Sequence, residues 1–155
     1  MPVTHVAYEV DDWGVGELWL DGTRVVWHEL PHPKAATGAT DRSVELVERL
    51  RGYFAGADDA LTDVDVDLEY ETPFLEHCAH ALREVPRGEV VSYGELAALA
   101  GAPGAARAAG SFCARNRLGL FVPCHRVVSA QGLGSYGSLG IEYKRRLLAL
   151  EGVVI

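Results

Sequence analysis

The sequence lacks several features that mark whole classes of protein. No stretch approaches the roughly 18 to 20 uninterrupted apolar residues of a membrane-spanning helix, and the start, MPVTHVAYEVDDW, has neither the basic nor the apolar region of a secretory signal. Only 3 of the 155 residues are cysteine, and no two of them form a Cys-x-x-Cys pair. We therefore expect an intracellular, cytoplasmic protein with free thiols and no disulfide framework.

The composition that remains is that of an ordinary folded protein. Hydrophobic residues make up 48% of the chain and charged residues 23%, with 17 glycines and 7 prolines, which excludes disorder and collagen. A chain of this length buries one core, or one core and a small lobe, but not two large domains. We therefore expect no separate cofactor-binding domain.

Charge is divided unevenly along the chain. Residues 1–70 carry 5 basic and 15 acidic side chains, whereas residues 71–155 carry 9 basic and 7 acidic ones. Most basic residues after position 85 are arginines, whose planar guanidinium suits phosphate. Each could equally be a solvated surface charge, and their clustering is what favours a polyanionic partner. These residues are Arg87, Arg107, Arg115, Arg117, Arg126, Lys144, Arg145 and Arg146.

The first thirty residues are predicted to form a small antiparallel sheet. Apolar and polar side chains alternate over residues 3–8, 17–20 and 24–30, which is typical of strands with one buried face. Asp21-Gly22 separates the last two runs and is a common hairpin turn.

A helix and an acidic stretch complete the first half. Apolar residues recur at helical spacing from Val44 to Phe54, and Gly56 ends the pattern. The alternating run Val64–Tyr70 fits either an edge strand or the linker to the second half. We therefore expect residues 1–70 to form one lobe of sheet plus helix.

Capping signals predict two helices in the second half. Thr72 is followed by proline, so that a hydroxyl cap precedes a proline at the first helical position. Ser92 and Glu95 have the spacing of a capping box, and Gly101 closes that helix.

An alanine-rich stretch, Ala105–Ala114, follows Pro103. A short turn separates it from the preceding helix, which is the spacing of a helix-turn-helix. Its small side chains would let a backbone approach DNA closely, or would pack closely against the core. We predict an α+β protein (α/β, two-lobed) whose residues 71–155 form a helical domain with a winged-helix-like helix-turn-helix.

The reactive chemistry is predicted around Cys124, which follows the apolar run 118–122. A cysteine becomes a nucleophile when a base favours its thiolate and a third group orients that base. His125 is the nearest base, and because neighbours in an extended segment point to opposite sides, a water would bridge the two. Glu151 is the first choice for the orienting carboxylate and Glu142 the second.

Two other interpretations of these residues stay open on spacing alone. A cysteine next to a histidine is more often a buried structural pair than a nucleophile with its base. A metal site is the weaker alternative, because three scattered cysteines lack ligand pairs at short spacing.

Four features together resemble the O6-alkylguanine-DNA alkyltransferases, also called methylated-DNA–protein-cysteine methyltransferases. The resemblance covers about Thr72 to Gly152, and the N-terminal sheet and helix match the family only in outline. The features are VSYGELAALAG at 91–101, AARA at 105–108, an asparagine eight positions before the cysteine, and PCHRVV at 123–128.

The resemblance implies a single-use repair protein. An alkylated guanine, with O4-alkylthymine as a second lesion, would be flipped out of double-stranded DNA and its alkyl group passed irreversibly to a cysteine. Cys124 would be the acceptor, His125 would deprotonate it through a water, and Glu151 would orient the imidazole. No cofactor or metal is implied, and we expect a monomer that binds no membrane.

The same resemblance assigns roles to residues that bind DNA or shape the pocket. Asn116 matches the asparagine that stabilises the turn leading to the cysteine. Arg107 matches the residue that enters the duplex in place of the flipped base. Tyr93 matches the residue that rotates the phosphate and donates toward the guanine, and Lys144 a lysine near the pocket.

The sequence departs from the family pattern at three places. Arg117 follows Asn116 where many relatives have proline, and would be a phosphate contact or part of a solvated loop. Tyr136 comes twelve residues after Cys124 rather than thirteen, so that Tyr136, Gly137 or Ser138 could face the alkyl group. The N-terminal half has His5, His28 and His32 but no cysteine, so we predict no zinc.

Three readings from other classes compete with alkyl transfer. A non-catalytic lesion sensor would lack the nucleophile, and Cys124 argues against it. A helix-turn-helix regulator with a structural cysteine would bind one sequence and form no thioether. A Cys-His hydrolase would need an oxyanion hole and would turn over.

Overall fold

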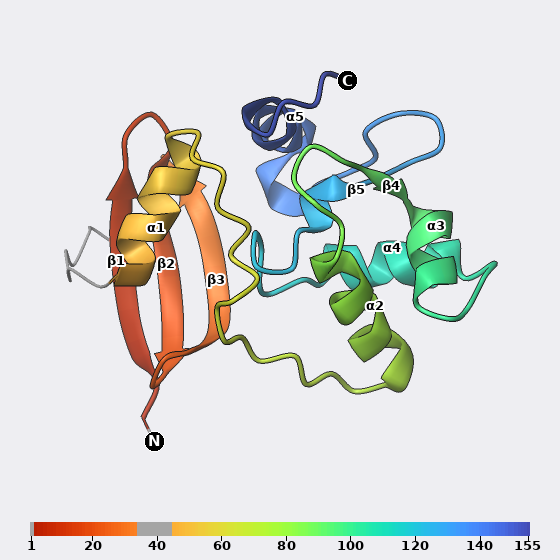
Figure 1. Ribbon diagram of the computed structural model, residues 1–155, viewed down its shortest axis with the longest axis horizontal. Coiled ribbons are helices and arrows are strands. Elements are labelled where there is room, and N and C mark those ends of the chain that lie inside the picture. Colours follow the sequence, from red (N-terminus) through yellow and green to blue (C-terminus); the bar gives the residue numbers. More distant parts are fainter. Residues whose placement is uncertain (1, 34–44) are drawn as a thin grey trace. The chain divides into compact units, whose positions relative to one another are not determined.

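A computed structural model describes residues 2–33 and 45–155, which form two compact units (Figure 1). The first unit comprises Met1–Asp67 together with Arg117–Gly119, and the second Leu68–Asn116 together with Leu120–Ile155. Helices and sheets are both present in the described residues, so the predicted α+β class is confirmed.

The first unit is built on an antiparallel sheet of three strands, β1 (Thr4–Val10), β2 (Gly14–Asp21) and β3 (Arg24–His32), in that order. Because side chains alternate between faces, Tyr8 and Leu18 lie on the buried face, which α1 (Glu45–Phe54) covers (Figure 1). The predicted sheet and helix are confirmed, although Val44 lies outside the described residues.

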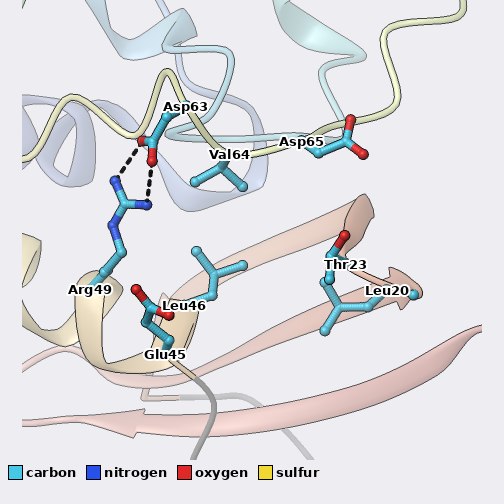
Figure 2. Close-up of a pocket in the computed structure, with 9 residues that line it drawn as sticks. Leu20, Thr23, Glu45, Leu46, Arg49, Asp63, Val64 and Asp65 are labelled. Atoms are coloured by element: carbon cyan, nitrogen blue, oxygen red, sulfur yellow. Dashed lines mark hydrogen bonds and ion pairs between the residues drawn. The ribbon is translucent and has the colours of Figure 1, made fainter.

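The segment after α1 is mostly irregular. Within 64–70 only Val66 forms a strand-like contact, a single parallel bridge to Val25. Arg49 ties α1 to this segment through hydrogen bonds of 2.7 to 3.1 Å to the carboxylates of Asp59 and Asp63. Beside that contact lies a cavity of about 420 Å³, which none of the predicted site residues lines (Figure 2).

Residues 117–119 belong to the first unit because they pair with β3. The backbone N–H of His28 donates to the carbonyl of Arg117 at 2.8 Å. Its ring Nδ1 donates to the carbonyl of Gly119 at 2.7 Å, and the hydroxyl of Tyr8 donates to its Nε2 at 2.6 Å. Burial lowers the pKa of His28 to about 4, so this histidine is neutral at pH 7.

The predicted helix starts of the second unit are confirmed. Thr72 caps α2 (Pro73–Arg83), accepting from the N–H of Leu75 at 3.3 Å. Ser92 and Glu95 form the capping box of α3 (Tyr93–Leu99), with bonds of 3.0 and 2.8 Å. The alanine-rich stretch forms α4 (Ala106–Ala114), which packs against α3. The helix-turn-helix geometry stays a prediction.

The rest of the second unit contains short elements and one longer helix. β4 (Val91–Ser92) pairs in parallel with β5 (Val127–Val128), which directly follows the 3₁₀ turn η1 (Cys124–Arg126). A second 3₁₀ turn, η2 (Gly137–Leu139), precedes α5 (Ile141–Leu150). In the described residues, no helix has the length and apolar character that crossing a bilayer requires.

Candidate functional site

Cys124 lies at the end of a buried segment. Residues 118–126 are all buried, and the side chain of Asn116 donates to the carbonyl of Val122 at 2.7 Å, which closes the turn before the cysteine. The expectation of an extended chain at Cys124 is wrong: the N–H of Arg126 donates to the carbonyl of Pro123 at 3.0 Å and closes a helical turn. Successive side chains of η1 therefore spread around a turn rather than alternating.

The thiol of Cys124 has polar neighbours on several sides. Burial raises its pKa, while hydrogen bonds from Asn116 and Tyr136 and the charge of Lys144 oppose that rise. All three cysteines are free, and burial also raises the pKa of Cys78, to about 11, and that of Cys113. Cys124 thus differs from Cys78, whose pKa is raised by burial alone, in having groups that stabilise a thiolate.

His125 is held by a buried carboxylate. Its Nε2 donates to Oε2 of Glu151 at 2.8 Å, and within the described part of the chain its buried Nδ1 has no hydrogen-bond partner. The proton is therefore on Nε2, which leaves the Nδ1 lone pair able to accept another. Glu142, the second choice, is exposed and pairs with Arg145 instead.

Glu151 is held in turn by Arg126. The guanidinium donates from Nε to Oε1 and from Nη2 to Oε2, both at 2.9 Å, and from Nη1 to the carbonyl of Val85 at 2.7 Å. Burial would raise the pKa of Glu151, but the bonds from His125 and Arg126 outweigh it and lower that pKa well below its usual range. The carboxylate is therefore ionised at neutral pH.

Lys144 reaches the site from α5 and is fully buried. Its Nζ donates to the carbonyls of Val127 at 2.6 Å and Ser135 at 3.2 Å, and lies 5.8 Å from the centre of the Tyr93 ring. Burial lowers its pKa, and the neighbouring thiols Cys124 and Cys113 act against that shift.

Tyr93 is half-buried at the start of α3, and its hydroxyl bonds to Ser135. A Cβ at Gly134 would lie 2.7 Å from that hydroxyl, and one at Gly110 3.8 Å from the ring. Two glycines thus leave room for this side chain. Burial raises the pKa of Tyr93, so its hydroxyl keeps its proton at neutral pH.

The remaining predicted site residues lie at the surface. Arg107 is exposed near the start of α4, and Ser138 is exposed in η2. Of the three residues left open for the loop after the cysteine, Tyr136 is the one that acts on the thiol, by opposing the rise in the pKa of Cys124.

Several of the basic residues counted as surface charge are engaged within the protein. Arg126 and Lys144 are 6% and 0% exposed, and both donate hydrogen bonds inside the second unit. Arg117 is neither a solvated loop residue nor free for phosphate, because it donates to the carbonyl of Asp67 at 2.9 Å. The exposed cations of the second unit are Arg107, Arg115, Arg145 and Arg146.

Arg126 is the site residue that the sequence reasoning missed, since it was counted with the surface cations. A signal was present: the residue sits between the apolar run 118–122 and Val127-Val128, and an arginine inside a buried segment requires a buried anion. The sequence predicts Glu151 only as the carboxylate that orients His125, and so does not pair it with Arg126.

Comparison with known proteins places this chain beside one family. A family model described as the DNA-binding domain of 6-O-methylguanine DNA methyltransferase matches residues 73–153. The methylated-DNA–protein-cysteine methyltransferase of Mycobacterium tuberculosis is 46% identical over 126 residues, covering 80% of this chain and 70% of that protein. The corresponding protein of Methanosarcina acetivorans is 44% identical over 110 residues, covering 70% and 68%.

A solved structure extends the likeness over the whole fold. The crystal structure of Mycobacterium tuberculosis OGT in complex with DNA matches with a TM-score of 0.79 and 34% identity, covering 96% of this chain and 92% of that one. The family model spans more than half of the chain, and the match includes the cysteine segment, α3, α4 and α5. The chain therefore belongs to the methylated-DNA–protein-cysteine methyltransferases, the family of O6-alkylguanine-DNA alkyltransferases that its motifs resemble.

Proposed function

We propose that this protein repairs DNA by moving the alkyl group of O6-alkylguanine onto Cys124, once per chain. The observation that carries this assignment is the arrangement around the thiol. Cys124 precedes a fully buried histidine whose Nε2 is bonded to Glu151 and whose Nδ1 has no partner in the described residues. That arrangement supports a base poised to take one proton.

The first step is removal of the thiol proton. A water bridging Cys124 and Nδ1 of His125 would carry the proton to the imidazole, and the ionised Glu151 would stabilise the imidazolium that forms. Hydrogen bonds from Asn116 and Tyr136 and the charge of Lys144 would stabilise the thiolate. The buried thiol therefore needs its base at the moment of reaction, because burial otherwise holds it protonated.

The second step is an in-line displacement at carbon. The thiolate sulfur forms a bond to the alkyl carbon, the bond from that carbon to guanine O6 breaks, and its electron pair leaves with the guanine. The departing guanine must then be protonated, and the Tyr93 hydroxyl is the donor that the family resemblance suggests. The product is a thioether, which nothing in the reaction returns to a thiol.

DNA would be bound by the second unit. Its four exposed arginines supply phosphate contacts, and Arg107 on α4 is the side chain we assign to the gap left by the flipped base. Flipping costs a few kcal/mol and is easiest at a weakened pair. Part of the selectivity for damaged guanine would therefore come from the DNA. A cytoplasmic location suits the reduced thiol that the reaction consumes.

The test is the intact mass of the protein before and after mixing with a duplex that carries O6-methylguanine. We expect one added methyl group per chain, which peptide mapping locates on Cys124. Cys124→Ser should lose transfer and keep lesion binding, because a hydroxyl is a far weaker nucleophile at neutral pH. Cys78→Ser is the matched control and should react like the wild type.

Each competing reading predicts a different outcome in the same assay. A lesion sensor or a regulator would bind DNA with no gain of mass, and a hydrolase would turn over many equivalents of substrate. Repeated turnover, or a methyl group found on Cys78 or Cys113, would refute the assignment of Cys124.

A further inference from the structure

We propose that Arg126 is a positioning residue for the transfer reaction: by pairing with Glu151 it keeps His125 neutral, and therefore able to accept the Cys124 proton. This inference rests on the proposed function and deepens it. It concerns a side chain two positions from the thiol that touches neither the sulfur nor, as we propose the chemistry, the alkyl group.

The contact between Arg126 and Glu151 fixes both the charge and the orientation of the carboxylate. Arg126 places two donors on the two oxygens of Glu151, each at 2.9 Å. Planar two-point pairing of this kind is specific to arginine, which stays charged at any ordinary pH. Oε2 of Glu151 accepts from both Arg126 and His125, so the arginine and the imidazole share one carboxylate oxygen.

The charges that face His125 explain what this sharing does. Arg126 comes from the same turn as His125, Lys144 from the first turn of α5 and Glu151 from the C-cap of α5; these are the groups whose charges act on the imidazole. A buried carboxylate paired with a histidine alone would favour the imidazolium. Here the guanidinium already balances that carboxylate, so protonating His125 would place a second cation on it.

The direction of the His125 pKa agrees with this balance. Burial lowers the pKa, Glu151 raises it, and the charges of Arg126 and Lys144 lower it again, with a net decrease. The imidazole is also fully buried, where an uncompensated positive charge is costly. His125 is therefore a neutral base at pH 7 rather than a proton-loaded acid.

Arg126 also has a purely structural contact, its bond to the carbonyl of Val85. Loss of that bond could slow any reaction by loosening the site, so a lower rate alone does not distinguish the two roles. The two roles differ in their effect on the pH at which the transfer rate falls to half its maximum, the midpoint of the pH profile. A structural defect lowers the rate by the same factor at every pH, whereas loss of the charge balance around His125 moves the midpoint.

The experiment measures single-turnover alkyl transfer from free O6-benzylguanine between pH 5 and 9. In Arg126→Met the midpoint of the acid limb should rise by about one pH unit or more, because the remaining carboxylate favours the imidazolium. The rate should then be about tenfold lower below the midpoint and recover toward the wild-type value at high pH. Arg126→Lys keeps the charge and should restore most of the wild-type midpoint.

Arg87→Met is the matched control. Arg87 also donates to a carbonyl near the end of α5, that of Leu150 at 2.9 Å, but it is not among the groups that shift the pKa of His125 or of Glu151. Its midpoint should equal that of the wild type. An unmoved midpoint in Arg126→Met, with the rate lowered equally at every pH, would overturn the proposal.

A second measurement keeps the proposal testable if Arg126→Met does not fold. The ¹⁵N spectrum of the His125 imidazole in the wild-type protein should show a neutral ring protonated on Nε2 at pH 7, and an imidazolium there would overturn the proposal. If the wild type gains no benzyl group at all, the proposed function has failed. If it gains one with normal rates and the midpoint is insensitive to Arg126, only the inference has failed.

Discussion

Acid should weaken the first unit through a single buried histidine. The pKa of His28 is about 4 in the folded chain because burial opposes its charge, against 6.5 when unfolded. Between these values the unfolded chain holds more protons, so the free energy of unfolding rises with pH. The contribution of neutral His28 to the free energy of unfolding is complete above pH 6.5 and is lost as the pH falls toward 4. The shift of 2.5 units corresponds to about 3 kcal/mol, of which about 2 kcal/mol is lost by pH 5.

His28→Gln provides the comparison, because an amide donates and accepts hydrogen bonds but does not titrate. Urea unfolding at pH 7 and pH 5 can be followed by tryptophan fluorescence, since Trp13, Trp19 and Trp27 all lie in the first unit with His28. The wild type should lose about 2 kcal/mol more than the variant between the two pH values. Subtracting the variant removes the contributions of depressed carboxylates elsewhere, such as Asp59. Equal losses in the two proteins would refute the assignment of a neutral buried His28.

Further substitutions test the second unit. Arg107→Ala should slow repair of duplex DNA severalfold and spare free O6-benzylguanine; equal loss on both substrates would remove its role in flipping. Tyr136→Phe should raise the Cys124 pKa and slow its alkylation by iodoacetamide at pH 8, with Ser138→Ala as the unaffected control; equal rates in both would exclude a stabilising effect of Tyr136 on the thiolate. Gly134→Ala should lower stability by about 1 to 2 kcal/mol in urea unfolding, because its φ of +78° and the nearby Tyr93 hydroxyl disfavour a Cβ; an unchanged midpoint would argue against that crowding.

Elements with local signals were predicted well from the sequence. The sheet and the caps at Thr72 and Ser92 depend on alternation, spacing and side-chain hydroxyls, all of which short sequence windows contain. Contacts across the chain were harder. Apolar residues flank Arg126 on both sides, but the carboxylate that pairs with it lies 25 residues later, outside any short window. The pairing of His28 with residues 117–119 spans about 90 positions and had no sequence signal.

The turn at Cys124 shows a different limit. An apolar run was read as an extended chain up to the cysteine, but Pro123 begins a helical turn there. The family resemblance predicted which residues lie near the thiol. The shifted position of Tyr136 did not decide which of three loop residues faces the alkyl group. The effect of Tyr136 on the pKa of the Cys124 thiol depends on the fold of that loop.

The pairing of His28 with residues 117–119 also has a consequence for synthesis on the ribosome. The first unit is discontinuous, because residues separated by 91 positions must meet before the buried imidazole has its Gly119 partner. When residues 1–70 have emerged, β3 still has unpaired hydrogen-bonding groups where 117–119 will lie, so it is an open edge during translation. Completion of this unit must wait for the segment that immediately precedes the reactive cysteine. The slowest contacts to form should therefore be those that span the chain from His28 to Gly119.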